Sequence, residues 1–341
     1  MNIKKIGLTA LAGSLVATTA FAGELSLSGS AKFSYKSMDG TNERVGASTG
    51  TTGTGMDTAS PFAMDQEITA SGSAELDNGM TVSVSHGLAT GGSGSDTSTL
   101  TLDMGDMGKL AYSDTDISGG LKALDDITPT AYEEADHGSG SGLGDLDLNG
   151  SENVIAYNTT VSGMTISAEY NPGTDVGTMQ GDGGTQTDSV GTAKNISIKG
   201  PLGDGVTVGL GYGEEESNTD VASVGNQPED DKFSTGFVTY AMGAITVGYQ
   251  MNEVDSGTAN EDTDATMMGI SYAVSDDLSV SINTSEVDIE NKSEHQEATS
   301  VSFSYTTGGL TISGTHGSMD NIGGTATSDE SQYELNFGFA F

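Results

Sequence analysis

The sequence contains no cysteine and no tryptophan, and basic residues are few. Without Cys, disulfide frameworks, thiolate metal sites and cysteine nucleophiles are excluded. Only 11 of the 341 residues are Lys or Arg, against 49 Asp or Glu, so the formal net charge is −38. Because phosphate binding needs clustered Lys and Arg, this charge balance excludes a nucleic-acid partner.

Apolar residues are also scarce, at 34% of the chain, and aromatic residues make up 6%. A soluble chain this charged and this poor in apolar residues is typically disordered. The apolar residues nevertheless recur at regular spacing, which indicates a folded chain. No window after the N-terminal segment approaches about 18 consecutive apolar residues, so membrane-spanning helices are not expected in the mature chain.

The first 22 residues have the three parts of a secretory signal peptide. Lys4 and Lys5 form a basic start, residues 6–17 are apolar, and Ala20-Phe21-Ala22 supplies small residues at the cleavage site. An apolar stretch of about 12 residues is too short for a membrane anchor, which needs about 20. We therefore expect cleavage after Ala22, export of the chain, and a mature protein of residues 23–341.

Alternation of apolar and polar residues dominates the mature chain. In residues 24–36, Leu25, Leu27, Phe33 and Tyr35 share one phase, while serines and lysines occupy the other. Residues 333–341 repeat the pattern with aromatic residues at nearly every second position. Similar alternation occurs at 206–212, 245–251, 278–282, 301–305 and 310–312. The pattern predicts β-strands with one apolar face, and helical periodicity of useful length is absent.

The breaks between these segments alternate between short and long. Short turns fall at 77–79, 106–108, 162–163, 201–205, 242–243, 275–277 and 307–309, where Gly and Asx residues suit hairpins. Long, polar, acidic breaks fall at about 38–61, 91–96, 115–151, 172–192, 214–231, 253–264, 288–297 and 318–330. Seven turns and eight loops join sixteen strands without a domain boundary.

Sixteen amphipathic strands with short turns at one end and long loops at the other predict an all-β, antiparallel transmembrane β-barrel. Closure pairs every strand edge, and the apolar face meets lipid while the interior is polar around water. A barrel of this size leaves a channel, because side chains cannot fill it. The soluble alternative, a β-rich adhesin or structural envelope protein, has no need for alternating loop lengths.

At three places the chain resembles the general porins of Gram-negative outer membranes, most closely the alphaproteobacterial porins. Residues 24–32 resemble the first porin strand, and residues 107–114 resemble the strand before the third loop. Residues 333–341 resemble the terminal strand, whose final Phe the barrel-assembly machinery reads. The resemblance implies a homotrimer in outer-membrane lipid and an assembly signal that includes Tyr333, Phe339 and Phe341. It also implies a third loop, here residues 115–151, that folds inward as a constriction.

The implied constriction loop is strongly acidic. From Asp114 through Glu152, both included, there are ten carboxylates and one lysine, Lys122. Such a loop inside a barrel sets a field across a narrow aqueous path. The residues expected on the acidic side of the constriction are in the middle of the loop: Asp125, Asp126, Glu133, Glu134 and Asp136.

The charges of the channel wall follow from the phase of the first two strands. Lys32 and Lys36 lie opposite in phase to Phe33 and Tyr35, so they are expected to point inward. Asp65 and Glu67 are placed inward by the same argument, at positions where related porins often carry arginines. The basic half of the constriction is therefore thin, and the sequence predicts a preference for cations.

The same loop contains a candidate calcium site. Asp145, Asp147 and Asn149 supply oxygens at alternate positions, and Glu152 can add more. The twelfth position of an EF-hand would be Ala156 instead of Glu, so an EF-hand is excluded. The segment can also be an ordinary acidic turn.

Taken together, these patterns predict an outer-membrane porin for passive diffusion of ions and small hydrophilic solutes, with no catalysis and no required cofactor. A channel specific for one solute class is the alternative within transport.

Overall fold

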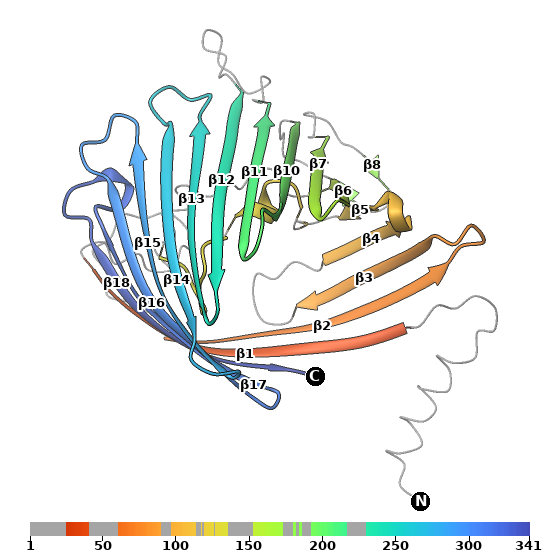
Figure 1. Cartoon of the computed structure of the whole chain (residues 1–341), viewed down its shortest axis with the longest axis horizontal. Helices are drawn as coiled ribbons and strands as arrows, with labels where there is room; N and C mark the ends of the chain where they lie inside the picture. The colour runs from red at the N-terminus through yellow and green to blue at the C-terminus, as the bar shows by residue number, and fades with distance from the viewer. Residues whose placement is uncertain are drawn as a thin grey trace, which may run out of the picture.

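The computed structural model describes residues 25–40, 61–89, 97–113, 117, 119–125, 127–135, 153–172, 180–181, 184–185, 192–216 and 230–341 (Figure 1). Within these ranges sixteen antiparallel strands form a closed barrel, in which β1 (Leu25–Gly40) pairs with both β2 (Phe62–Glu75) and β18 (Glu330–Ala340). No helix in the described part of the chain is long and apolar enough to cross a membrane. The predicted sixteen-stranded antiparallel barrel is confirmed.

The other barrel strands follow one another around the wall in chain order. They are β3 (Thr81–Ala89), β4 (Thr97–Asp103), β5 (Lys109–Ser113), β6 (Val154–Val161), β7 (Met164–Asn171), β10 (Ala193–Pro201), β11 (Val206–Glu215), β12 (Asp231–Met242), β13 (Ile245–Asp255), β14 (Thr263–Ala273), β15 (Leu278–Ile289), β16 (Gln296–Thr307) and β17 (Leu310–Asp320). Short 3-10 turns occur at η1 (Gly105–Met107), η2 (Lys122–Leu124) and η4 (Ile322–Gly324). β8 (Gln180–Gly181) and β9 (Gly184–Thr185) form a separate two-stranded sheet.

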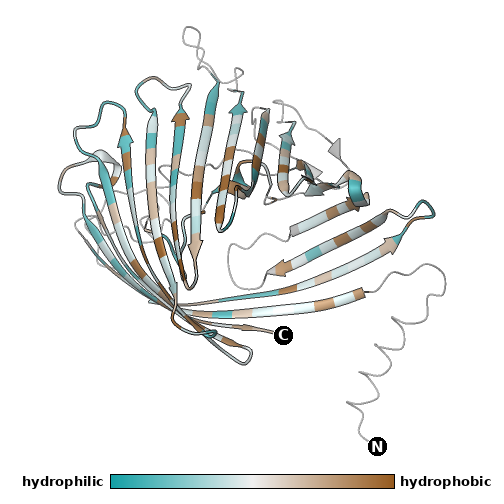
Figure 2. Cartoon of the chain, in the orientation of Figure 1, coloured by the Kyte–Doolittle hydropathy of each residue, from teal (hydrophilic) through white to brown (hydrophobic). Residues whose placement is uncertain are grey.

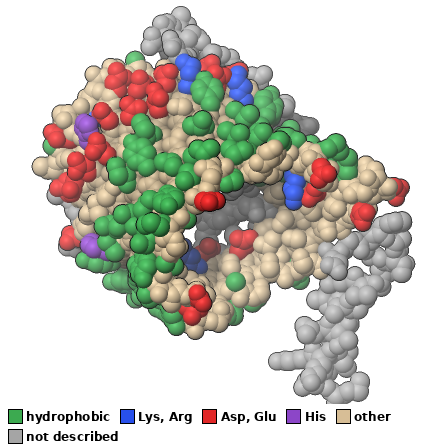
Figure 3. Space-filling view, viewed as in Figure 1, with side chains coloured by type: hydrophobic (Ala, Val, Ile, Leu, Met, Phe, Trp, Pro, Cys, Tyr) green, Lys and Arg blue, Asp and Glu red, His purple; other side chains and the backbone are tan. Residues whose placement is uncertain are grey.

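Side chains alternate between an apolar outer face and a polar inner face. On β15, Ile282 points outward and is 47% exposed, whereas its neighbours Ser281 and Asn283 are buried inside. The outward row of apolar side chains recurs from strand to strand, as Figures 2 and 3 show. A soluble protein would bury such rows, so the outer face is suited to lipid.

All seven predicted short turns join neighbouring strands at one end of the barrel. Gly163 in the turn between β6 and β7 has a φ of 84°, and Gly108 between β4 and β5 has a φ of 94°. Positive φ is costly for residues with a Cβ, which explains why glycine occupies these turns.

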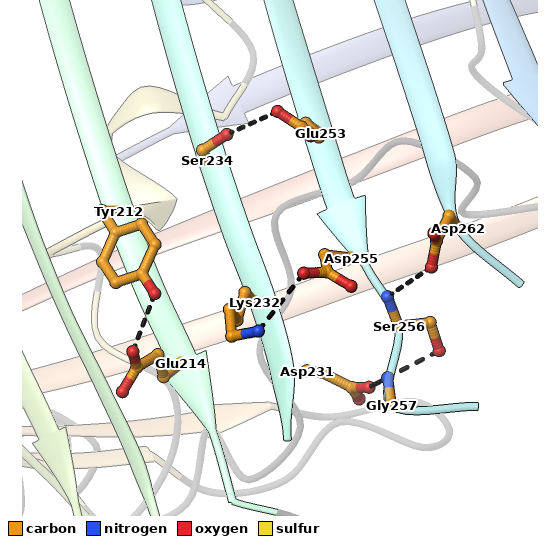
Figure 4. A network of polar contacts seen from close by, with 10 residues as sticks. All are labelled: Tyr212, Glu214, Asp231, Lys232, Ser234, Glu253, Asp255, Ser256, Gly257 and Asp262. Atoms are coloured by element: carbon orange, nitrogen blue, oxygen red, sulfur yellow. Dashed lines mark hydrogen bonds and ion pairs between the residues drawn. The ribbon is translucent and has the colours of Figure 1, made fainter. Parts of the chain in front are cut away.

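At the opposite end the strands are longer than the sequence indicated. The loops predicted at 253–264, 288–297 and 318–330 were one to three residues too long at each end, because β13 to β18 continue into them. Outward residues there are charged or polar, so the apolar alternation stops while the hydrogen-bonded ladder goes on. Figure 4 shows this rim, where Lys232 Nζ of β12 lies 3.3 Å from Asp255 Oδ2 of β13.

The barrel closes between the first strand and the last residue of the chain. The Gly29 N–H donates to the Phe341 carbonyl at 2.8 Å, and the Phe341 N–H donates to the Gly29 carbonyl at 2.9 Å. The rings of Tyr333, Phe339 and Phe341, the three residues of the expected assembly signal, are exposed on the outer face. The end of the chain is therefore part of the wall.

Candidate channel constriction

The segment after β5 lies along the inner face of the wall. Its described residues are 117, 119–125 and 127–135. We call these residues the inner segment. Along its length it contacts inward side chains of β7, β10, β13, β15, β16 and β18, and inward glycines of β11. In Figure 1 the inner segment is drawn in yellow, within the ring of strands.

The inner segment begins on serine and asparagine side chains of β7 and β10. The Gly120 N–H donates to Ser167 Oγ at 2.7 Å, and the hydroxyl of Ser197 donates to the Gly120 carbonyl. The Leu121 N–H donates to Asn195 Oδ1 at 2.9 Å. The wall side chains thus satisfy backbone groups that no strand pairs, as buried polar groups require.

Further along the inner segment, the side-chain amide of Gln250 on β13 bonds the segment's backbone through both its nitrogen and its oxygen. Gln250 is fully buried; its Nε2 donates to the Leu124 carbonyl at 2.6 Å, and its Oε1 accepts from the Ile127 N–H at 3.3 Å. The series continues on β15, where Asn283 Nδ2 donates to the Pro129 carbonyl at 3.2 Å. The polar inner face therefore acts as a continuous set of partners for this segment.

An apolar cluster inside the barrel anchors the start of the inner segment. Leu121 is fully buried against Phe233 of β12, with Val254 of β13 packed beside them. Gly211 and Gly213 of β11 leave room for its side chain, since an added Cβ would lie 2.5 and 2.7 Å from the Leu121 methyl groups. Leu121 is thus enclosed by the wall on several sides.

Replacing Leu121 with Ala is expected to loosen the inner segment without unfolding the barrel. Truncation of a buried Leu costs about 2–4 kcal/mol, which here opposes docking of the segment. The backbone amide of Gly120 should therefore exchange with solvent more than tenfold faster in hydrogen-exchange measurements. Leu210→Ala, the same change on the outer face of β11, is the control, and equal exchange in the two variants would contradict the anchoring role.

At its other end, the inner segment meets the barrel seam through Tyr132. The Tyr132 hydroxyl donates to Glu334 Oε1 at 2.8 Å, and Asn336 Nδ2 donates to the same carboxylate oxygen at 2.5 Å. Lys32 Nζ of β1 lies 5.9 Å from the centre of the Tyr132 ring. Burial, followed by the hydrogen bond to Glu334, raises the pKa of the Tyr132 hydroxyl, so it remains a donor.

Of the loop carboxylates predicted to form the acidic side, the structure describes Asp125, Glu133 and Glu134. All three are half-buried residues of the inner segment. The Glu133 carbonyl accepts from Ser302 Oγ of β16 at 2.8 Å, which fixes the backbone there. Asp126 and Asp136 lie outside the described residues.

The four wall residues predicted to point inward share the inner face of β1 and β2. Lys32 lies opposite Asp65 in the strand register, and Glu67 lies opposite Ser30. Lys36 lies opposite Glu334 of β18. Lys32, Asp65 and Glu67 are exposed, unlike the inward residues that the inner segment covers.

Three further inward charges were not singled out from the sequence as constriction residues. Glu334 holds Tyr132, and Glu169 of β7 accepts from Asn195 Nδ2 at 3.1 Å. Lys199 of β10 donates through Nζ to the Ala123 carbonyl at 2.7 Å. Each has the inward phase of its strand, but phase alone does not indicate which inward residues the loop reaches.

The candidate calcium ligands Asp145, Asp147, Asn149 and Glu152 lie outside the described residues. Within the part of the chain that the structure describes, no group of three or more His, Asp or Glu side chains is arranged to hold a metal ion.

Comparisons with known proteins agree with this architecture. A sequence profile of the Gram-negative porin family matches residues 7–299. No curated protein sequence matches the chain significantly.

Several solved porin structures are similar to this barrel. An anion-selective porin from Comamonas acidovorans has a TM-score of 0.65 at 14% identity, covering 94% of this chain and 100% of that chain. A loop-deletion mutant of OmpT, an outer membrane protein of Vibrio cholerae, has 0.64 at 13%, with the same coverage. A triple mutant of the Rhodopseudomonas blastica porin has 0.60 at 17%, covering 93% of this chain and 100% of that chain. At these identities the similarity establishes the fold.

Proposed function

Because this chain belongs to the Gram-negative porin family, an outer-membrane channel is its general function, and we propose that it conducts small hydrophilic solutes and ions by passive diffusion. The observation that supports this most is the asymmetry of the inner wall. The inner segment covers polar residues from β7 to β18, whereas Lys32, Asp65 and Glu67 on β1 and β2 stay exposed. A polar passage between the inner segment and β1–β2 suits water and hydrated solutes.

Cation preference is the finer part of the proposal. The inward carboxylates Asp65, Glu67 and Glu334 face a passage with few lysines, and Lys199 is held behind the inner segment by a backbone carbonyl. Of the similar structures, one is described as an anion-selective porin, so this fold is compatible with selectivity of either sign. The charges that line the passage therefore decide the selectivity of this chain.

The remaining parts of the proposal concern assembly. The chain is exported after cleavage of residues 1–22, is inserted by the barrel-assembly machinery through its last strand, and acts as a homotrimer in outer-membrane lipid. Residues 115–151 as a whole form its constriction loop. Neither a catalytic step nor a cofactor enters this function, and calcium at Asp145, Asp147, Asn149 and Glu152 stays a prediction from the sequence.

Purified protein in a planar lipid bilayer tests the channel. We expect discrete conductance steps from folded protein and none from the same sample after boiling, because heat unfolds the barrel. Electrophoresis with and without boiling checks that the sample was folded. A folded barrel that neither conducts nor lets small sugars enter liposomes would contradict the proposal.

A further inference from the structure

Two glycines face the interior of the barrel beneath the middle of the inner segment. Gly248 of β13 and Gly269 of β14 are direct cross-strand partners, and both have the inward phase of Gln250 and Ser271. Pro129 of the inner segment lies directly over this pair. Glycine weakens a strand interior, so a facing pair indicates that something must approach the wall closely.

The two glycines meet different atoms of Pro129. A Cβ added at Gly248 would clash with Pro129 Cδ and lie 3.1 Å from Pro129 Cγ, both atoms of the ring. A Cβ added at Gly269 would lie 2.6 Å from Asn283 Nδ2, 2.7 Å from the Pro129 carbonyl oxygen and 3.0 Å from the Pro129 nitrogen. Gly248 therefore makes room for the Pro129 ring, and Gly269 makes room for the Pro129 backbone and for the Asn283 amide that is hydrogen-bonded to it.

Hydrogen bonds on both sides keep Pro129 over this pair of glycines. Asn283 of β15, the cross-strand partner of Gly269, donates to the Pro129 carbonyl at 3.2 Å. Gln250 of β13 accepts from the Ile127 N–H two residues earlier. Proline has no N–H that needs a partner, so its ring can lie flat against the wall.

We infer that Gly248 and Gly269 are positioning residues that set the aperture of the channel through Pro129. The two glycines let the inner segment lie close against β13 and β14. A side chain at either position would push the inner segment toward the passage and make the passage narrower. The inference rests on the proposed channel function and adds the residues that determine its size limit.

The first test is Gly248→Ala. To restore ordinary carbon–carbon contact, Pro129 must move about 1 Å away from the wall, toward the interior of the barrel. We expect the single-channel conductance to fall by about one fifth and the entry of larger sugars into liposomes to slow more than that of small ones, as for a narrower pore.

A second substitution separates positioning from general damage. Pro129→Ala removes Cγ and Cδ, so in the Gly248→Ala background it should restore the wild-type conductance. Gly269→Ala should also lower the conductance, but Pro129→Ala should not restore it, because the clash there is with the Asn283 amide and with backbone atoms of residue 129, which alanine keeps. If Gly248→Ala fails to fold, Gly269→Ala, alone and combined with Pro129→Ala, still tests the inference.

The matched control is Gly317→Ala on β17. Gly317 is also inward, opposite Ser300 and Gln332, but the nearest atom to an added Cβ is 3.8 Å away. Its conductance should equal that of the wild type. Wild-type conductance in folded Gly248→Ala and Gly269→Ala proteins, or equal rescue of both by Pro129→Ala, would overturn the inference. A wild-type protein that does not conduct contradicts the channel function itself.

Discussion

Deletion of Phe341 is expected to lower the amount of folded protein in the outer membrane by about tenfold or more, because it removes the last residue pair of the seam that closes the barrel. Phe341 contributes both a donor and an acceptor to the seam with Gly29. Without them, two backbone groups at the closing edge lose their partners, and in lipid each unsatisfied group costs several kcal/mol. The exposed strand edge is also open to wrong pairing.

The aromatic ring has its own place at this seam, which supplies the control. An added Cβ at Gly29 would lie 2.6 Å from Phe341 Cζ, so the ring lies over a glycine of β1. Phe341→Tyr keeps the backbone pairing and most of the ring packing, and its level should be close to that of the wild type. The measurement is the heat-modifiable fraction in isolated outer membranes. Normal levels of the deletion variant would show that the last residue is dispensable for closure.

The fold could be predicted because its pattern is local. Alternation such as Val280, Ile282 against Ser281, Asn283 gives the strand and both of its faces, and Gly-containing turns such as residues 162–163 fix the hairpins. Contact with lipid favours an apolar residue at every outward position, so the same alternation of apolar and polar residues is expected in all sixteen strands.

Strand ends could not be predicted from that rule. Outside the apolar band, hydropathy no longer alternates, although Glu253 and Asp264 remain cross-strand partners. Backbone pairing does not depend on apolar side chains, so the ladder continues into segments that resemble loops in sequence.

The contacts of the candidate constriction were also beyond the sequence. Gln250 and Asn283 have the same alternation as residues that face water, and the sequence suggested a polar interior around water throughout. In the structure both are buried, because the inner segment lies on them. Contacts between residues more than 100 positions apart leave no periodic signal, and a polar side chain can serve water or a backbone amide equally well.

Neutralising the exposed carboxylates of β2 is expected to reduce the preference for cations. In Asp65→Asn/Glu67→Gln, Lys32 loses the carboxylate opposite it, and the passage loses two negative charges. A unit charge 4 Å from an ion is worth about 4 kcal/mol at an effective dielectric of about 20, before screening and hydration reduce it. We expect the cation-to-anion permeability ratio to fall about two- to fivefold, as measured by reversal potentials in a KCl gradient. Asp125→Asn/Asp126→Asn in the loop should act in the same direction.

Two comparisons decide whether position or total charge is responsible. Glu286→Gln/Asp288→Asn removes two carboxylates from the outer face of β15, and charges beyond about 8–10 Å are screened at physiological salt. This variant should keep the wild-type ratio, whereas Lys32→Ala should raise it because the exposed carboxylates then lack the opposing cation. The differences should grow as the KCl concentration is lowered, since screening weakens. An anion-selective wild type, or equal shifts from the inner and outer carboxylate pairs, would show that these wall charges do not set the selectivity.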